Sequence, residues 1–332
     1  MDRNTGILYI ADFFGNRIRK LTPDGIISTH AGDGEHDFVN GPASSARFRW
    51  PRGVAVDSTG IVYVSDYNNH CIRKVAANTV STLAGVCGTS GFNNGAGASA
   101  LFNNPAGLTL DNSGNLFVAG HSDGRIRKIV LSSLTVSTFA GGSTMGSTNG
   151  QGTAARFNYP YDVAFNNSGY LFVADKDNNM IRVISPSGYV SLFAGSSSGL
   201  LDGQGGAAMF HTPSALAFDG NGNLYVADYN NQGIRKISPS GLVTSITNSK
   251  NLEGDQRGPA LKASFRHPIG IEVDGNGTIY VADDDSNKIE IICNMTCING
   301  AADCFGNRCK CDIGWTGANC GTLIPTTSKK QD

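Results

Sequence analysis

The sequence predicts an all-β protein: a six-bladed β-propeller with incomplete ends, followed by a small disulfide-rich domain. Two observations predict this fold. A strand-like segment that begins with Gly occurs six times, and its last residue recurs at steps of 53 to 55 residues, at Asp12, Asp66, Gly120, Asp175, Asp228 and Asp283. Six of the eight cysteines lie between Cys293 and Cys320, which is the density of a disulfide scaffold.

Each copy contains several strand signals, here named a to d. In the second copy strand a covers residues 51–57, strand b 60–66, strand c 72–75 and strand d 81–85. An Asp/Asn-x-x-Gly turn joins strand a to strand b, and strand c alternates apolar with charged residues, as half-buried strands do. Four short strands cannot bury both faces of their sheet alone, so the copies are expected to pack face to face around a ring.

Residues that recur in the copies are predicted to be structural. A phenylalanine before strand a is expected to fill the space between adjacent blades, at Phe48, Phe102, Phe157, Phe210 and Phe265. The aspartates that end strand b are expected to cap turns or to pair with arginines of strand c. Those arginines, on a strand face that is either solvated or paired, are Arg19, Arg73, Arg127, Arg182 and Arg235.

The two ends of the repeat are incomplete. The first copy has strands b, c and d but lacks strand a, and the last copy has strands a, b and c but lacks strand d. One upstream segment of roughly 30 residues, about the length of a strand d, a loop and a strand a, would supply both missing strands and cover the exposed edges. We therefore expect that this sequence is truncated at its N-terminus and that a signal peptide lies further upstream; the alternative is an intact chain whose ring stays open.

The repeat resembles a known family. The residues that carry the resemblance are Phe48-x-x-Pro-x-Gly-Val-Ala-Val-Asp57, then Gly60-x-Val-Tyr-Val-Ser-Asp66, then Ile72-Arg-Lys-Val75, and the other copies repeat them in register. This pattern resembles the NHL repeat over roughly residues 1–292. The resemblance implies four-stranded blades with strand a innermost.

The cysteine-rich segment, residues 293–321, resembles an EGF-like module, most closely from Cys309 to Cys320, where Gly314-Trp315 and Gly317 separate the last cysteines. Six cysteines permit 15 pairings. The resemblance implies Cys293–Cys304, Cys297–Cys309 and Cys311–Cys320. Residues 322–332 are expected to form a disordered tail.

Two other features bear on the compartment of the protein. A hairpin that turns near Asn78 would bring Cys71 and Cys87 almost level, so they form either a disulfide or two small buried or free thiols. Candidate glycosylation sequons are present at Asn166, Asn276 and Asn294. Both features fit an extracellular or cell-surface protein.

The loop that enters strand a should line one mouth of the central channel, and there the copies differ. Its aromatic, cationic and imidazole side chains supply the stacking surfaces and directional donors that a polar ligand site needs. The candidate ligand-binding residues are Trp50, Arg52, Tyr159, Tyr161, Asp162, His211, Arg266 and His267.

The function that we expect is a non-catalytic extracellular binding scaffold whose partner is a protein or a glycan. NHL-like propellers include the peptidylglycine amidating lyases, which hold a metal with histidines; here His211 and His267 could converge, but no third ligand is evident. Intracellular NHL propellers that bind RNA are the other alternative. A formal net charge of −1 disfavours nucleic acid, and no apolar run reaches the roughly 18 residues of a membrane span. We expect no catalytic residue, metal or cofactor. The propeller-plus-EGF combination resembles the teneurins.

Overall fold

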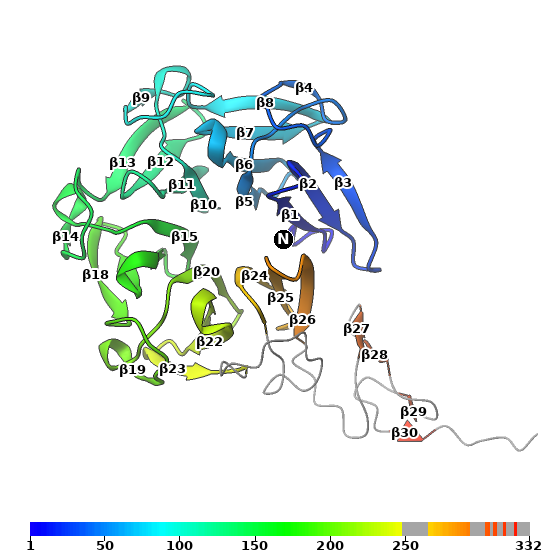
Figure 1. The fold of residues 1–332 in the computed structure, drawn as a ribbon, viewed down its shortest axis with the longest axis vertical. Helices are drawn as coiled ribbons and strands as arrows, with labels where there is room; N and C mark the ends of the chain where they lie inside the picture. Colours follow the sequence, from blue (N-terminus) through cyan, green and yellow to red (C-terminus); the bar gives the residue numbers. More distant parts are fainter. Residues whose placement is uncertain (248–264, 293–302, 306–307, 311–314, 317–321, 324–332) are drawn as a thin grey trace, which may run out of the picture.

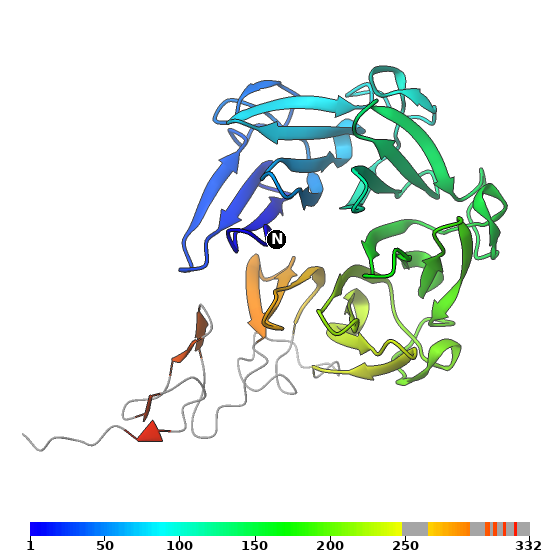
Figure 2. The ribbon, with the colours of Figure 1, turned by 180° about the vertical axis from the view of Figure 1, so that it is seen from behind.

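The protein is a six-bladed β-propeller, as the repeat predicts (Figure 1). The computed structural model describes residues 1–247 and 265–292, and the backbone of residues 303–305, 308–310, 315–316 and 322–323. Six antiparallel sheets follow one another around a ring in chain order, and the view from behind shows the same order (Figure 2). We number them as blades 1 to 6.

Blades 2 to 5 each contain strands a, b, c and d in that order from the centre outward. Blade 2 consists of β5 (Pro51–Val56), β6 (Val62–Asp66), β7 (Cys71–Ala76) and β8 (Thr79–Ala84). Blade 3 consists of β10 (Pro105–Leu110), β11 (Asn115–Gly120), β12 (Arg125–Val130) and β13 (Thr135–Ala140). Blade 4 consists of β15 (Pro160–Phe165), β16 (Leu171–Asp175), β17 (Met180–Ile184) and β18 (Tyr189–Ala194). Blade 5 consists of β20 (Pro213–Phe218), β21 (Leu224–Asp228), β22 (Gly233–Ile237) and β23 (Leu242–Ser245).

Within the described residues the first and last blades have three strands each, as the sequence predicts. Blade 1 has strands b, c and d, which are β1 (Leu8–Asp12), β2 (Arg17–Leu21) and β3 (Ile27–Ala31). Blade 6 has strands a, b and c, which are β24 (Pro268–Val273), β25 (Ile279–Asp283) and β26 (Lys288–Ile292). The innermost strand of blade 1 is therefore a strand b, and the outermost described strand of blade 6 is a strand c.

Beyond the propeller the structure gives two short backbone pairings. Strand β27 (Asp303–Phe305) pairs with β28 (Arg308–Lys310), and β29 (Trp315–Thr316) pairs with β30 (Thr322–Leu323). The first two residues of the expected tail thus belong to β30. The disulfides Cys293–Cys304, Cys297–Cys309 and Cys311–Cys320, and the sequon at Asn294, involve side chains outside the described residues.

In the part of the chain that the structure describes, four blades carry a fifth, outermost strand that the sequence analysis missed. These strands are β4 (Gly41–Pro42), β9 (Gly95–Ala96), β14 (Gly150–Gln151) and β19 (Gly203–Gln204), and they pair with β8, β13, β18 and β23 respectively. Each belongs to the loop that leaves the preceding blade. The chain therefore crosses the outer edge of a blade before it enters that blade at strand a.

Short 3-10 helices complete the connections. Three follow the outer strands, namely η2 (Gly97–Ser99), η3 (Gly152–Ala154) and η5 (Gly205–Ala207). Three others form the turn between strands b and c, namely η1 (Tyr67–Asn69), η4 (Lys176–Asn178) and η6 (Tyr229–Asn231). Because strand a runs antiparallel to strand b, these b–c turns lie at the same end of the blade as the start of strand a.

The repeated phenylalanines fill the space between blades, as predicted. Phe102 packs with Ile72 and Ala84 of blade 2 and with Leu116 and Val118 of blade 3. The other four occupy equivalent positions, and all five are at most 2% exposed. Burying a phenyl ring is worth roughly 1.5–3 kcal/mol, so these side chains hold each blade against the next.

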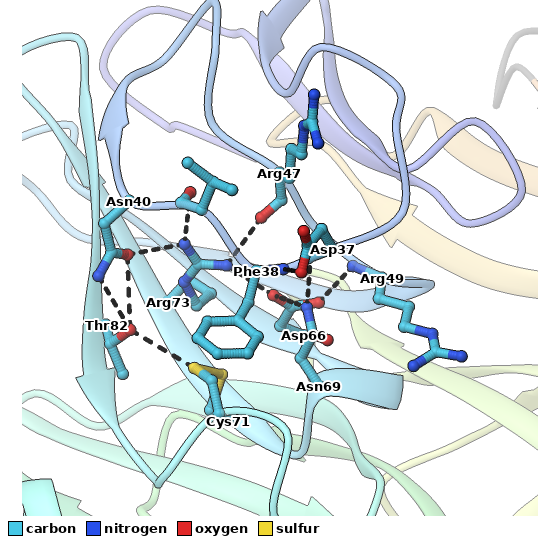
Figure 3. The surroundings of a disulfide bond; sticks show 12 residues. Asp37, Phe38, Asn40, Arg47, Arg49, Asp66, Asn69, Cys71, Arg73 and Thr82 are labelled. Atoms are coloured by element: carbon cyan, nitrogen blue, oxygen red, sulfur yellow. Dashed lines mark hydrogen bonds and ion pairs between the residues drawn. A yellow bond between two sulfur atoms is a disulfide. The ribbon is translucent and has the colours of Figure 1, made fainter.

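The strand-c arginines of blades 2 to 5 are fully buried and paired, which decides between the two alternatives for that face. Arg73 donates to Asp66 Oδ2 at 2.7 Å, to the carbonyls of Arg47 and Val39, and to Asn40 Oδ1 (Figure 3). The same pairing joins Arg182 to Asp175 and Arg235 to Asp228. The acceptors other than the aspartate lie in the loop that carries the outer strand, so each arginine ties that loop to its blade.

Cys71 and Cys87 form a disulfide, with their Cα atoms 5.1 Å apart. The hairpin of β7 and β8 turns at Ala77 and Asn78, which both have positive φ, and this turn brings the two cysteines level as predicted. The hydroxyl of Thr82 lies 3.4 Å from Cys87 Sγ, beside the outer strand of the same blade (Figure 3). The bridge fixes the start of the loop that leaves blade 2.

Candidate functional site

The residue after the proline of strand a is redirected by a β-bulge. In blades 2 to 6 strand a contains one residue more than strand b between the paired proline and the next paired residue. Bulges at such rims turn a side chain out of the regular alternation. The residues placed in this way are Arg52, Ala106, Tyr161, Ser214 and Ile269, of which Arg52 and Tyr161 were predicted.

A second set of residues lies beside them, and the sequence analysis missed it. It is the position immediately after strand b, which each of the six blades contributes once: Phe13, Tyr67, His121, Lys176, Tyr229 and Asp284. No two neighbouring blades have the same residue there. The signal was available, because these residues directly follow the repeated aspartate or, in blade 3, Gly120. We call these six residues, together with Arg52 and Tyr161, the central cluster.

Arg52 lies at the middle of the central cluster. Its guanidinium carbon is 4.4 Å from the ring centroid of Tyr67, 4.5 Å from that of Tyr161 and 4.9 Å from that of Phe13. These residues come from blades 2, 4 and 1, so one cation joins three blades. Cation–π contacts of this kind are worth about 0.5–2 kcal/mol each, depending on how far they exclude water.

His121 is held between aromatic residues on both sides. Its Nδ1 lies 3.1 Å from the hydroxyl of Tyr67, and its ring lies 5.0 Å from Tyr159 and 5.5 Å from Tyr161. Burial, followed by the charges of Arg52 and Lys176, lowers the pKa of His121 to about 3. The imidazole is therefore neutral at physiological pH and adds no positive charge to the cluster.

A second cation lies on the same tyrosine. Lys176 Nζ is 5.1 Å from the centroid of the Tyr161 ring. Burial lowers the pKa of Lys176, the neighbouring Asp177 opposes that change, and the charge of Arg52 adds to it. Tyr161 is 4% exposed, and burial raises the pKa of its phenol. Two cations thus contact the ring of one buried, neutral tyrosine.

The acidic part of the cluster comes from blades 5 and 6. The ring of His267 stacks on Tyr229 with centroids 4.5 Å apart, and its Nδ1 lies 2.6 Å from Asp285 Oδ2. Burial, followed by the charge of Asp285, raises the pKa of Asp284. The central cluster is therefore cationic toward blades 2 and 4 and anionic toward blade 6.

Two predicted residues form an exposed aromatic rim. Trp50 is 39% exposed and stacks on Phe13 with centroids 5.5 Å apart, and Tyr159 is 38% exposed beside His121. Both precede the proline of strand a and have positive φ, with their loops held by backbone hydrogen bonds such as that from Trp50 N–H to Asn16 Oδ1. Phe14, 69% exposed, extends the rim on blade 1.

The structure places the remaining predicted residues differently. Asp162 accepts hydrogen bonds from the N–H groups of Leu216 and Val163, and it packs so closely on Gly107 that a Cβ there would clash with it. It therefore connects the inner strands of blades 3, 4 and 5. His211 and Arg266 are fixed through their backbone N–H groups, which donate to Asp228 and Asp283.

The remaining sequence features to place are the alternative metal site, membrane-spanning segments and the glycosylation sequons. In the described part of the chain no group of three or more His, Cys, Asp or Glu side chains is arranged to hold a metal ion. Among the same residues no helix is long and apolar enough to cross a membrane. Asn276 is exposed, whereas Asn166 is half-buried at a cavity of about 220 Å³ between blades 4 and 5, at the opposite end of the strands from the central cluster.

Comparison with known proteins agrees with this architecture. Residues 48–75, which include β5, β6 and most of β7, match the family model of the NHL repeat. The chain is 28% identical to human NHL repeat-containing protein 2, over 88% of this chain and 45% of that protein. It is 26% identical to mouse teneurin-4, over 86% of this chain and 12% of that protein. The chain thus spans less than half the length of these curated relatives.

Two solved structures are similar to this chain in fold. A chain of a nidogen/laminin complex superposes with a TM-score of 0.57 at 15% identity, over 86% of this chain and 88% of that chain. Virginiamycin B lyase from Staphylococcus aureus superposes with a TM-score of 0.53 at 16% identity, over 87% of this chain and 78% of that chain. The repeat match, the six copies of its pattern and the relatives support the NHL repeat family for this all-β, six-bladed propeller.

Proposed function

We propose that this protein is a non-catalytic, extracellular interaction scaffold that binds a protein partner through the end of the propeller where the central cluster lies. One observation carries the proposal. Six blades built on one repeat contribute six mostly different side chains at one structural position, beside an exposed rim of Phe14, Trp50 and Tyr159. Aromatic residues and arginine are the residue types enriched at protein interfaces.

The extracellular location is supported by the disulfide between Cys71 and Cys87, because such bonds persist in oxidising compartments. The exposed sequon at Asn276 is accessible for glycan attachment. By contrast, the side-chain Oδ1 of Asn166 accepts hydrogen bonds from the backbone N–H groups of Ser168 and Tyr170. When the chain is expressed in the secretory pathway, we expect Asn276→Gln to remove more glycosidase-sensitive mass than Asn166→Gln.

The test of the interaction surface uses tagged protein added to living cells, with surface binding measured by flow cytometry. The test variant combines Phe14→Ala, Trp50→Ala and Tyr159→Ala. The matched control combines Tyr170→Ala, Tyr189→Ala and Leu242→Ala, three exposed apolar residues at the opposite end of the strands. We expect the test variant to lose at least ten-fold in binding and the control to keep it. Equal binding by the two variants would exclude this surface.

A further inference from the structure

We propose that Arg52 is the anchor of a carboxylate-binding site, into which a partner polypeptide inserts an acidic side chain or its C-terminal carboxylate. This inference rests on the proposed function, since it names the chemical group that the interaction surface takes. The site consists of Arg52 with its three aromatic neighbours, Phe13, Tyr67 and Tyr161, and of Lys176, which contacts the same Tyr161 ring.

The hydrogen-bond donors of Arg52 are unused. A guanidinium carries five N–H groups in a planar fork that matches a carboxylate. Within the described residues none of these groups donates a hydrogen bond. Nε is buried without a partner, as it also is in Arg73, so the two arginines differ in their Nη atoms. Arg73, in the same blade, uses its Nη atoms in four hydrogen bonds. The two arginines differ in their acceptors, because the Nη atoms of Arg73 face carbonyl and carboxylate oxygens whereas Arg52 lies over aromatic rings.

The charge of Arg52 also lacks a close partner within the described residues, none of which places a carboxylate within 4.0 Å of it. Asp284 acts on Arg52 only at longer range, and Asp285 is engaged by His267. The buried arginines of blades 2, 4 and 5 each have an aspartate at 2.7–3.0 Å. A partly buried cation of this kind gains most from an anion that arrives with a ligand.

The neighbours of Arg52 favour an anion attached to an apolar stem. Lys176 lies on the same Tyr161 ring, so an anion placed between the two cations relieves their repulsion. The exposed side chains of Phe14 and Trp50 beside the cluster offer apolar surface for a methylene chain. The exposed rim formed by Phe14, Trp50 and Tyr159 surrounds this site with the surface of a protein interface, which favours a polypeptide over an acidic glycan.

The experiment measures the affinity of the full chain for three peptides by isothermal titration calorimetry. They are acetyl-Gly-Glu-Phe-Gly-amide, its Gln counterpart, and the Gln peptide with a free C-terminal carboxylate. We expect at least one carboxylate peptide to bind ten-fold more tightly than the neutral one, and the two arms tell a side chain from a chain terminus. Arg52→Met should abolish this preference, and Arg52→Lys should restore only part of it.

Thermal unfolding of Arg52→Met separates a binding role from a structural one. We expect a change in melting temperature much smaller than that of Arg73→Met, because the loss of the cation–π contacts is offset by the removal of a partly buried cation without acceptors. A loss of stability as large as that of Arg73→Met would assign Arg52 to the fold and overturn the proposal. So would equal affinity for all three peptides, no binding of any, or binding of a hyaluronan tetrasaccharide in their place. If any of these results is found but cell-surface binding is still lost in the variant at Phe14, Trp50 and Tyr159, the carboxylate site is refuted and the proposed interaction surface stands.

Discussion

Arg73 and Arg52 are two arginines of one blade with opposite surroundings. Arg73 is completely buried, pairs with Asp66 and ties the incoming loop to its blade. Arg52 lies between aromatic rings and donates to no described residue. The first arrangement recurs in blades 4 and 5, whereas the second occurs once among the described residues. The repeated arginines use their Nη atoms within the fold, while the arginine at the variable position has no acceptor among the described residues and keeps its donors for the proposed ligand.

The largest expected effect comes from removing a repeated arginine. Arg73→Met leaves Asp66 buried without its counter-charge, and it also removes the donors to two loop carbonyls. Breaking a buried pair in this way costs about 3–5 kcal/mol. The matched control is Arg19→Met in blade 1, where the equivalent arginine donates only to the exposed hydroxyl of Thr29, and we expect a change within about 0.5 kcal/mol. Urea unfolding measures both, and equal losses would contradict the comparison.

A second prediction concerns the pH dependence of Asp162, a buried carboxyl group that has no arginine partner. Burial raises its pKa from 3.8 to about 7. The folded protein therefore binds more protons than the unfolded chain in this window, and stability falls as the pH rises from about 4 to 7. Relative to Asp162→Asn, which does not titrate, the unaltered protein should lose up to about 4 kcal/mol across the window. Parallel stability profiles of the two proteins would refute the assignment.

The smallest expected effect sharpens the comparison in blade 3, where the repeated aspartate is replaced by Gly120. There Asp123 occupies the space that a side chain at Gly120 would fill, and it lies 3.8 Å from Arg127. Gly120→Asp alone brings two carboxylates together and should cost about 2 kcal/mol. Adding Asp123→Asn recreates the Asp and Asn of blade 2, Asp66 and Asn69.

We expect the double variant to recover the stability that Gly120→Asp loses. A double-mutant cycle with urea unfolding measures the coupling between the two positions, which should be about 1–3 kcal/mol. Additive losses would mean that Asp123 does not stand in for the missing aspartate.

The blades could be predicted from the repeat because its apolar positions are the side chains that become buried between blades. The spacing of the phenylalanines and the alternation in strand c follow directly from which side chains face a neighbouring blade. The outer strands such as β4 were missed because two residues, Gly41 and Pro42, carry no alternation to detect. Their position is set by the partner strand and by Arg73, which contacts their loop across the blade.

The candidate site could be predicted only in part. Arg52 and Tyr161 stood out because they vary at a position next to a fixed proline. Phe13, Tyr67 and Lys176 belong to a different part of each copy, and only the ring brings them to the same place. Asp162 is a polar residue in a variable loop, and the sequence does not indicate that its carboxylate accepts from two backbone N–H groups within the inner strands.

The outer strands also set the order in which the strands of each blade are synthesised. Strand β4 precedes β5 to β8 in the sequence, so ribosomal synthesis releases the outermost strand of blade 2 before any other strand of that blade. A nascent chain that has emerged as far as Ala84 already contains all five strands of the sheet. A fragment that starts at Trp50 contains four of them and exposes the edge of β8. Blades 2 to 5 can therefore be completed one at a time during translation, from the N-terminal side onward.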